Sequence, residues 1–215
     1  MENEIILREE NGIVYEILQE NDLDETATVL SEVFTGGEPV TMSQDITPKE
    51  FHYFAEIYCK KAITDGVSII AKDEGKIIAF VISEDFDSEQ PEGIDKIDIK
   101  LVPLMALVDE IEKDMKSNKK EGEKRFHMFL GGTDKQHEGK HIGHNLIEES
   151  MKLAKIKNFT SVIVEPSGFK TQHIFNILGF VQKGVIDYRS FQYNGENVFK
   201  NIVGPVGLPI MEKEL

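Results

Sequence analysis

One stretch of the sequence, residues 131–144, constrains the fold of the chain more than any other. It reads Gly-Gly-Thr-Asp-Lys-Gln-His-Glu-Gly-Lys-His-Ile-Gly-His, after an alternating apolar run at 125–130 and before an amphipathic pattern that starts at Ile142. This order predicts a strand, a glycine-rich loop and the N-terminus of a helix. The backbone N–H groups of such a loop and the positive end of the helix dipole favour a bound phosphate.

The same letters contain His137-Glu138-Gly139-Lys140-His141, which has the His-Glu-x-x-His spacing of zinc hydrolases. That spacing places two imidazoles on one face of a helix, whereas Gly139 costs roughly 1 kcal/mol inside a helix. Lys140 would add positive charge beside the ion, and the sequence indicates no third ligand. We therefore keep a zinc hydrolase as the weaker alternative and expect no bound metal.

Ahead of this stretch, the sequence patterns predict helices and a hairpin. Thr47-Pro48-Lys49-Glu50 has the cap, the proline and the glutamate of a helix start. Asp22-Leu23-Asp24-Glu25 has the spacing of a second capping box. In order, we expect a first strand at 13–18, a helix from Asp22 to Gly36-Gly37, a helix from Thr47 to Gly66, and hairpin strands at 67–71 and 76–83.

Further patterns complete the predicted architecture. Apolar residues at 101–115 recur in steps of three and four, which predicts a helix within an insertion at about 85–124. After the glycine-rich stretch we expect a strand at 160–164, a helix at 168–178, and a final hairpin of 181–193 and 198–203 around Asn194-Gly195. The fold class is α/β (α+β): one domain over residues 1–215, with a mixed, mostly antiparallel sheet flanked by helices.

Charge and cysteine content exclude several classes of function. The net charge of −15 and the pI near 4.8 argue against nucleic-acid and anionic-membrane partners, because phosphate neutralisation needs clustered Lys and Arg. The longest apolar run has about eight residues, against the roughly 20 of a spanning helix. Cys59 is the one cysteine, and the N-terminus lacks the pattern of a signal peptide. We expect a cytoplasmic protein.

The glycine-rich stretch resembles the loop of the GNAT superfamily of N-acetyltransferases. Residues 139–150 fit that family's Gln/Arg-x-x-Gly-x-Gly/Ala loop and helix, and Ile177-Leu178-Gly179-Phe180 fits its Leu-Gly-Phe helix end. The resemblance implies acetyl-CoA as co-substrate, with its pyrophosphate on the loop amides and its pantetheine arm between the strands at 131–133 and 160–164. The cofactor-binding residues it implies are Gly131, Gly132, Thr133, Glu138, Gly139, Lys140, His141, Ile142, Gly143, Thr171 and Phe175.

Three residues depart from the family pattern. Glu138 stands where the family has Gln or Arg, and His141 stands where it has the first glycine. Phe175 occupies the position of the tyrosine that in many members protonates the leaving thiolate, so this chain would need another acid. The same departures suit a second hypothesis, a non-catalytic acyl-CoA-binding sensor.

A second segment is similar to insect-type arylalkylamine N-acetyltransferases. Residues 33–39 match their Phe-x-x-x-Glu-Pro segment, whose glutamate is the proposed base and corresponds to Glu38. A carboxylate can accept the proton that an amine loses when it attacks a thioester. Ser167 and Thr171 match serines of the subfamily and could relay a proton, or Ser167 could simply cap a helix. Glu165 is a reserve candidate for the base, with a surface acid as its simpler interpretation.

The resemblance implies transfer of the acetyl group to a primary amine of a small molecule, by direct attack and without an acyl-enzyme. The subfamily match and the negative net charge of the chain favour an arylalkylamine or a polyamine-like substrate. The apolar stripe at 101–115 fits core packing better than a partner face, and a homodimer contact there is the alternative.

Overall fold

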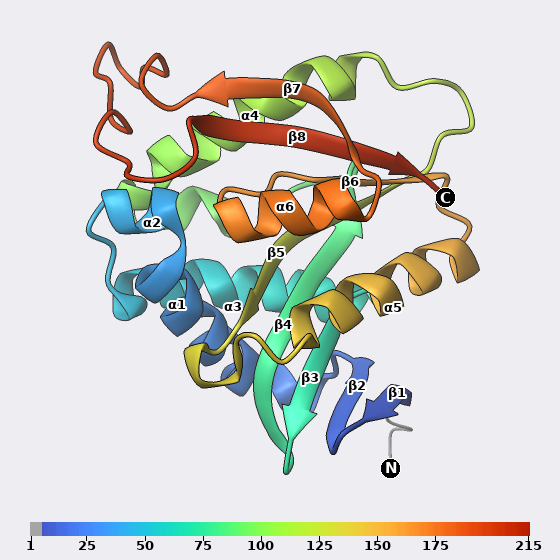
Figure 1. Cartoon of the computed structure of the whole chain (residues 1–215). Helices are drawn as coiled ribbons and strands as arrows, with labels where there is room; N and C mark the ends of the chain where they lie inside the picture. The colour runs from blue at the N-terminus through green and yellow to red at the C-terminus, as the bar shows by residue number, and fades with distance from the viewer. Residues whose placement is uncertain (1–5) are drawn as a thin grey trace.

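A computed structural model describes residues 6–215 as one mixed sheet with helices on both faces (Figure 1). Residues 1–5, which carry much of the N-terminal segment considered for a signal peptide, lie outside the described range. The strands are β1 (Ile6–Glu10), β2 (Ile13–Ile17), β3 (Ile69–Asp73), β4 (Lys76–Asp85), β5 (Arg125–Thr133), β6 (Ser161–Val164), β7 (Val181–Asp187) and β8 (Gly207–Glu214). They follow the order β1-β2-β3-β4-β5-β6-β8-β7, in which only the pairing of β5 with β6 is parallel.

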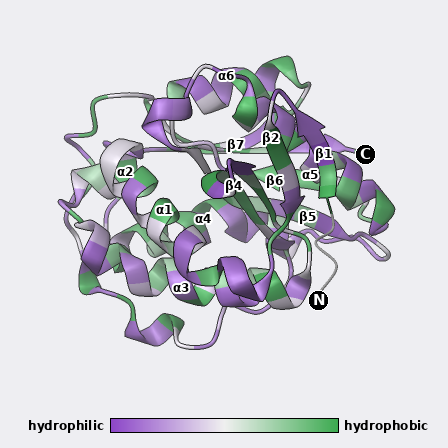
Figure 2. Ribbon diagram, turned by 90° about the horizontal axis from the view of Figure 1, so that it is seen from below, coloured by the Kyte–Doolittle hydropathy of each residue, from purple (hydrophilic) through white to green (hydrophobic). Residues whose placement is uncertain are grey.

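The helices form the outer layers of the domain. They are α1 (Leu23–Gly37), α2 (Pro39–Ser43), α3 (Pro48–Asp65), α4 (Val102–Ser117), α5 (Ile142–Ile156) and α6 (Phe169–Ile177), with 3-10 turns at Glu20–Asp22, Ile94–Lys96, Ile99–Leu101 and Lys135–His137. One core lies between α1, α3 and the sheet, around Leu30, Phe54 and Phe80. A second core joins α5 to the opposite face, around Met128 and Leu146. Figure 2 shows hydrophilic residues along the outer side of α3.

Several local predictions are confirmed. Thr47 accepts a hydrogen bond from the backbone of Glu50, whose side chain in turn accepts one from the backbone of Thr47. Gly66 ends the same helix with a positive φ of 61°, a conformation that glycine adopts without steric cost. The mixed α/β architecture with a mostly antiparallel sheet also agrees with the prediction.

Asp22 is the N-cap residue of α1, as predicted, but the predicted capping box does not form. The Asp22 side chain makes no capping bond to α1, and it accepts a bond from the backbone N–H of Gln19 at 3.2 Å. It also receives the Lys72 ammonium at 2.7 Å. The Asp22 carboxylate thus bonds to the start of the 3-10 turn at Glu20–Asp22 and to Lys72 of β3, and it is not free to cap α1. The sequence reading also missed β1, a short and highly charged strand at the sheet edge.

The predicted final hairpin is wrong in its strands. Asn194 and Gly195 do form a tight turn with positive φ angles, but only Tyr193 and Glu196 bridge across it. The long strands are β7 and β8, and β8 inserts between β6 and β7. Burial explains this pairing, because Ile210 and its neighbours in β8 are enclosed, whereas Val203 in the predicted strand is 98% exposed.

The predicted helix at 101–115 is present as α4, and its apolar stripe packs inside the chain. Leu107 and Ile111 are buried with residues of β7 and β8, so the stripe is part of the core. Within residues 6–215, no helix combines the length and the apolar character that crossing a membrane requires.

The Cys59 thiol provides a test of the packing of α3. It is fully buried, and burial raises the pKa of Cys59 to about 12. Alkylation needs the exposed thiolate, so we expect iodoacetamide to leave the folded protein unmodified and to add one group per chain in denaturing urea. Mass spectrometry reads the single site directly. Rapid stoichiometric alkylation of the folded protein would contradict this packing.

Candidate functional site

The parallel strands β5 and β6 separate partway along their length. They pair at Arg125–Ser161, Phe126–Val162 and His127–Ile163, and no further pair is formed among the described residues. Beyond this point β5 continues to Thr133 alongside β4, while β6 ends at Val164 with β8 on its other edge. We call this divergence of β5 and β6 the wedge. Along it, the edge of β5 that faces β6 has no strand partner among the described residues.

Gly131, Gly132 and Thr133 are the last residues of β5, at the edge of this wedge. A side chain at Gly132 would place its Cβ 2.5 Å from Cγ1 of Val33 in α1 and 3.2 Å from Cζ of Phe80. Gly131 is exposed, and a Cβ there would meet its nearest atoms at 3.8 Å. Packing against α1 thus explains why position 132 is a glycine. At Gly131 no side chain covers the backbone beside the wedge, and the residue is exposed.

The loop from Asp134 leads into the N-terminus of α5 as predicted. Gly139 has a φ of 77°, and His141 caps the helix with a φ of 62°, a left-handed conformation that favours glycine. His141 therefore adopts the backbone that a glycine would provide. The side chain of Ile142 is buried, but the first backbone N–H groups of α5 have no intrahelical partners and favour an anion.

Glu138 forms an ion pair across the wedge. Its carboxylate lies 2.7 Å from the ammonium of Lys170 at the start of α6, and both side chains are largely exposed. The acid in the loop is thus partly neutralised by a residue that the sequence analysis did not identify. Lys170 had no signal in the sequence, because the contact joins residues 32 positions apart.

The geometry of the zinc alternative is absent from the loop. His137 belongs to a 3-10 turn and is held by Asp134 at 3.0 Å, and His141 precedes the first turn of α5. Gly139 lies between them with a positive φ, so the two imidazoles do not share one helical face. The His-Glu-x-x-His spacing is therefore incidental to the folded structure.

Glu38 is the N-cap of α2 and not part of an open loop. Its carboxylate accepts hydrogen bonds from the backbone N–H groups of Val40, at 3.0 Å, and Thr41, at 2.6 Å. Pro39 at the first helical position favours this start. The helix lies beside the connection from β7 to β8 (Figure 1), where the amide of Gln44 donates to the carbonyl of Val198 at 3.3 Å.

A buried tyrosine stands near Glu38. Tyr188, which follows β7, is 1% exposed, and its hydroxyl has no hydrogen-bond partner among the described residues. Burial and the negative charge of Glu38 raise the pKa of Tyr188 above its usual value. The Tyr188 hydroxyl is therefore a buried polar group in the core below α2 whose pKa is influenced by the charge of Glu38.

The three predicted residues of the α6 region occupy different environments. Thr171 donates its hydroxyl to the carbonyl of Gly168 at 2.9 Å in the first helical turn. Gly168 is the N-cap of α6, so Ser167 does not cap the helix. Phe175 is buried and packs edge-on against Phe180, with 4.9 Å between ring centroids. Ser167 remains half-buried at the end of the wedge.

Glu165 is buried, so its interpretation as a surface acid is wrong. Its carboxylate lies 2.6 Å from Nε2 of His127, whose Nδ1 lies 3.2 Å from Glu84 and whose Nε2 lies 3.7 Å from Glu112. Burial alone would lower the pKa of His127, but Glu165 and Glu84 outweigh it and raise that pKa well above its usual value. Burial raises the pKa of Glu112 to about 7.

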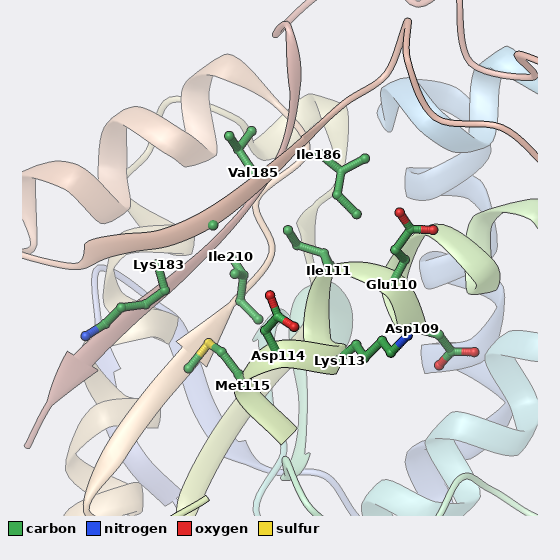
Figure 3. A pocket seen from close by; sticks show the side chains of 11 residues that line it. Asp109, Glu110, Ile111, Lys113, Asp114, Met115, Lys183, Val185, Ile186 and Ile210 are labelled. Atoms are coloured by element: carbon green, nitrogen blue, oxygen red, sulfur yellow. The ribbon is translucent and has the colours of Figure 1, made fainter. Parts of the chain in front are cut away.

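A groove of about 770 Å³ lies elsewhere, between α4 and the strands β7 and β8 (Figure 3). Ile111, Ile186 and Ile210 supply its apolar part, and Asp114 and Lys183 are among its charged residues. None of the predicted site residues lines this groove. We place the candidate site at the wedge because the glycine-rich loop, the N-terminus of α5 and the start of α6 meet there.

Solved structures with the same fold include several amine acetyltransferases. Arylalkylamine N-acetyltransferase 2 from Aedes aegypti is 24% identical with a TM-score of 0.81, over 95% of this chain and 99% of that one. The Drosophila melanogaster polyamine N-acetyltransferase is 17% identical with a TM-score of 0.76, over 94% and 100%. The C-terminal condensation domain of Ebony, in complex with β-alanyl-dopamine, is 14% identical with a TM-score of 0.84, over 94% and 99%.

No model of a protein family matches the sequence, and no curated protein matches it. The structural likeness extends over nearly the whole of each chain, so the predicted GNAT fold is confirmed.

The two glycines at the end of β5 give a matched test of the wedge. Replacing Gly132 by Ala forces its Cβ into Val33, and overpacking of this kind costs about 1–3 kcal/mol of the free energy of unfolding. Gly131→Ala has room for its methyl group and should stay within about 0.5 kcal/mol of the parent. Urea unfolding measures both. Equal losses in the two variants would contradict the described contact with α1.

Proposed function

We propose that the chain is an acetyl-CoA-dependent N-acetyltransferase that acetylates a primary amine of a small molecule. The observation that carries this proposal is the wedge between β5 and β6, beside a loop that opens the N-terminus of α5. A phosphate-bearing co-substrate would find the first amides of α5 there, along with the side chains of Lys140 and Lys170. The arylalkylamine, polyamine and agmatine acetyltransferases with the same fold support the amine acceptor.

The donor site fits the chemistry of a pyrophosphate despite Glu138. A carboxylate beside a phosphate is unfavourable, but the Lys170 ammonium at 2.7 Å offsets the charge of Glu138. His141 supplies the left-handed backbone of the family glycine without blocking the helix start. The exposed backbone of Gly131 at the edge of β5 can pair with the amides of a pantetheine arm.

Glu38 is our proposed base for the acceptor amine. The amine nitrogen attacks the thioester carbonyl carbon, its proton moves to the Glu38 carboxylate directly or through water, and the C–S bond breaks as the amide C–N bond forms. Two backbone N–H groups orient this carboxylate, and each of its oxygens has two lone-pair sites. The buried hydroxyl of Tyr188 provides an additional polar contact for the acceptor.

The leaving thiolate needs a proton that Phe175 cannot supply. Ser167 and Thr171 lie at the end of β6 and in the first turn of α6, where they could pass a proton from solvent. Phe175 is a core residue in this chain. It stands where the family has a tyrosine, and its ring packs against Phe180.

The acceptor and the donor are tested in one assay. We expect acetyl-CoA to raise the melting temperature, and free CoA to accumulate only when an arylalkylamine, agmatine or spermidine is added. Stabilisation without turnover over a broad amine panel would favour the second candidate, a non-catalytic acyl-CoA sensor. The observation that favours this candidate is Phe175, which stands where the family has the tyrosine that protonates the leaving thiolate. Absence of any stabilisation by acetyl-CoA would overturn both.

Replacement of Glu38 tests the base. We expect Glu38→Gln to lower kcat/KM by about 10²–10⁴-fold near neutral pH. The deficit should shrink as the pH rises, because a larger fraction of the acceptor amine is then already deprotonated. Damage to the α2 cap alone would give a loss that does not vary with pH. Glu38→Asp, which retains a carboxylate cap, serves as the control for folding.

The Glu138–Lys170 pair sets the affinity for CoA. We expect Glu138→Gln to bind CoA more tightly and Lys170→Gln to bind it more weakly, each by roughly two- to fivefold, since exposed ion pairs contribute about 0.2–1 kcal/mol. Isothermal titration at low and high salt measures both effects, and salt should reduce them. Weaker CoA binding by Glu138→Gln, or tighter binding by Lys170→Gln, would show that the pair does not face the phosphate groups.

A further inference from the structure

Four ionisable side chains converge at the base of the wedge: three are at most 5% exposed, and the fourth, Glu84, is 17% exposed. His127 of β5 is 2% exposed, and its ring lies among Glu84 of β4, Glu112 of α4 and Glu165 after β6. The proposed transfer assigns no step to any of them. Such a group of buried charges needs compensation by cations.

The charges of the cluster are not balanced by Lys and Arg alone. Glu84 contacts the Lys61 ammonium at 3.0 Å, and Glu112 contacts that of Lys116 at 2.6 Å. Among the described residues, the cationic partner of Glu165 is His127, and the second oxygen of this 95% buried carboxylate has no hydrogen-bond partner. The Glu165 carboxylate thus contacts the imidazole of His127 through one oxygen and leaves the other oxygen without a partner among the described residues.

The geometry points to a metal site: we propose that Glu112, His127 and Glu165 bind one divalent transition-metal ion such as Zn²⁺. One ligand atom of each lies within 4.8 Å of the others. Nε2 of His127 lies 2.6 Å from Glu165 and 3.7 Å from Glu112, and ligand atoms around a tetrahedral zinc lie roughly 3.3 Å apart. A bound ion therefore requires the Glu165 carboxylate to move away from Nε2 of His127.

The surroundings of His127 match those of a metal-binding imidazole. Glu84 lies 3.2 Å from Nδ1, where a carboxylate fixes the tautomer that presents Nε2 to a metal. A cavity of about 20 Å³ adjoins Glu84, Glu112 and His127, which is room for one water as a fourth ligand. Imidazole with carboxylates suits zinc, iron and manganese better than calcium or magnesium.

The ion would fasten α4 to the point where β5 and β6 separate. Glu112 lies on α4, His127 forms the last pair between the two strands, and Glu165 follows the end of β6. Metal binding would therefore stabilise the folded arrangement of α4, β5 and β6. This stabilisation can be measured without any assay of acetyl transfer. Failure of the site would leave the proposed enzyme activity untouched.

The test uses the full chain, stripped of metal with a chelator and titrated with Zn²⁺ and with Co²⁺. We expect one equivalent to bind, with the visible absorption of low-symmetry Co²⁺, and a rise in melting temperature of roughly 5–10 °C at a hundredfold excess over Kd. His127→Gln and Glu165→Gln should abolish binding. Glu84→Gln should weaken it by about 10–100-fold, because it only orients the imidazole.

His137→Gln is the matched control, since it removes a histidine of the His-Glu-x-x-His spacing and leaves the buried cluster intact. It should bind metal like the parent. Absence of binding to the parent up to about 1 mM, or loss of binding in His137→Gln with retention in His127→Gln, would overturn the proposal. If circular dichroism shows that His127→Gln does not fold, metal binding by Glu165→Gln and the Co²⁺ spectrum of the parent protein decide whether the site exists.

Discussion

The end of the parallel pairing at His127 and Ile163 is the constraint on which the rest of the structure depends. Pro166 explains why β6 cannot follow β5 further, because proline has no N–H to donate and restricts Glu165 before it. Strand β5 continues beside β4 to Thr133, whereas β6 ends at Val164, paired with β8 along its other edge. The loop, the N-terminus of α5 and the start of α6 then border the opening that this divergence creates.

Local sequence signals predicted the elements whose stabilising contacts are themselves local. The Thr47 capping box, the glycine end of α3 and the loop before α5 each depend on neighbours a few residues away. The errors arose where distant residues decide. Lys72 of β3 captures the carboxylate of Asp22, and β8 displaces the strand expected after Asn194-Gly195 because its own apolar residues are buried.

The same distinction applies to the candidate site. The glycine-rich loop and Glu38 were identifiable because they lie in short motifs, whereas Lys170 and the partners of His127 are brought in by the fold. Along β5, Arg125 and His127 alternate with apolar residues, yet both are buried because α4 covers that side through Glu112 and Met115. A polar residue on a central strand can thus belong to a buried ionic cluster.

The absence of room at Gly132 has a mechanical consequence. The side chain of Val33 in α1 fills the space over Gly132, since a Cβ added at Gly132 would fall 2.5 Å from Cγ1 of Val33. Helix α1 ends at Gly37, and Glu38 follows it directly. Under the proposed function, α1 would therefore join the strand edge on the donor side to the carboxylate on the acceptor side, and a shift of β5 on ligand binding would act on Glu38 through Val33.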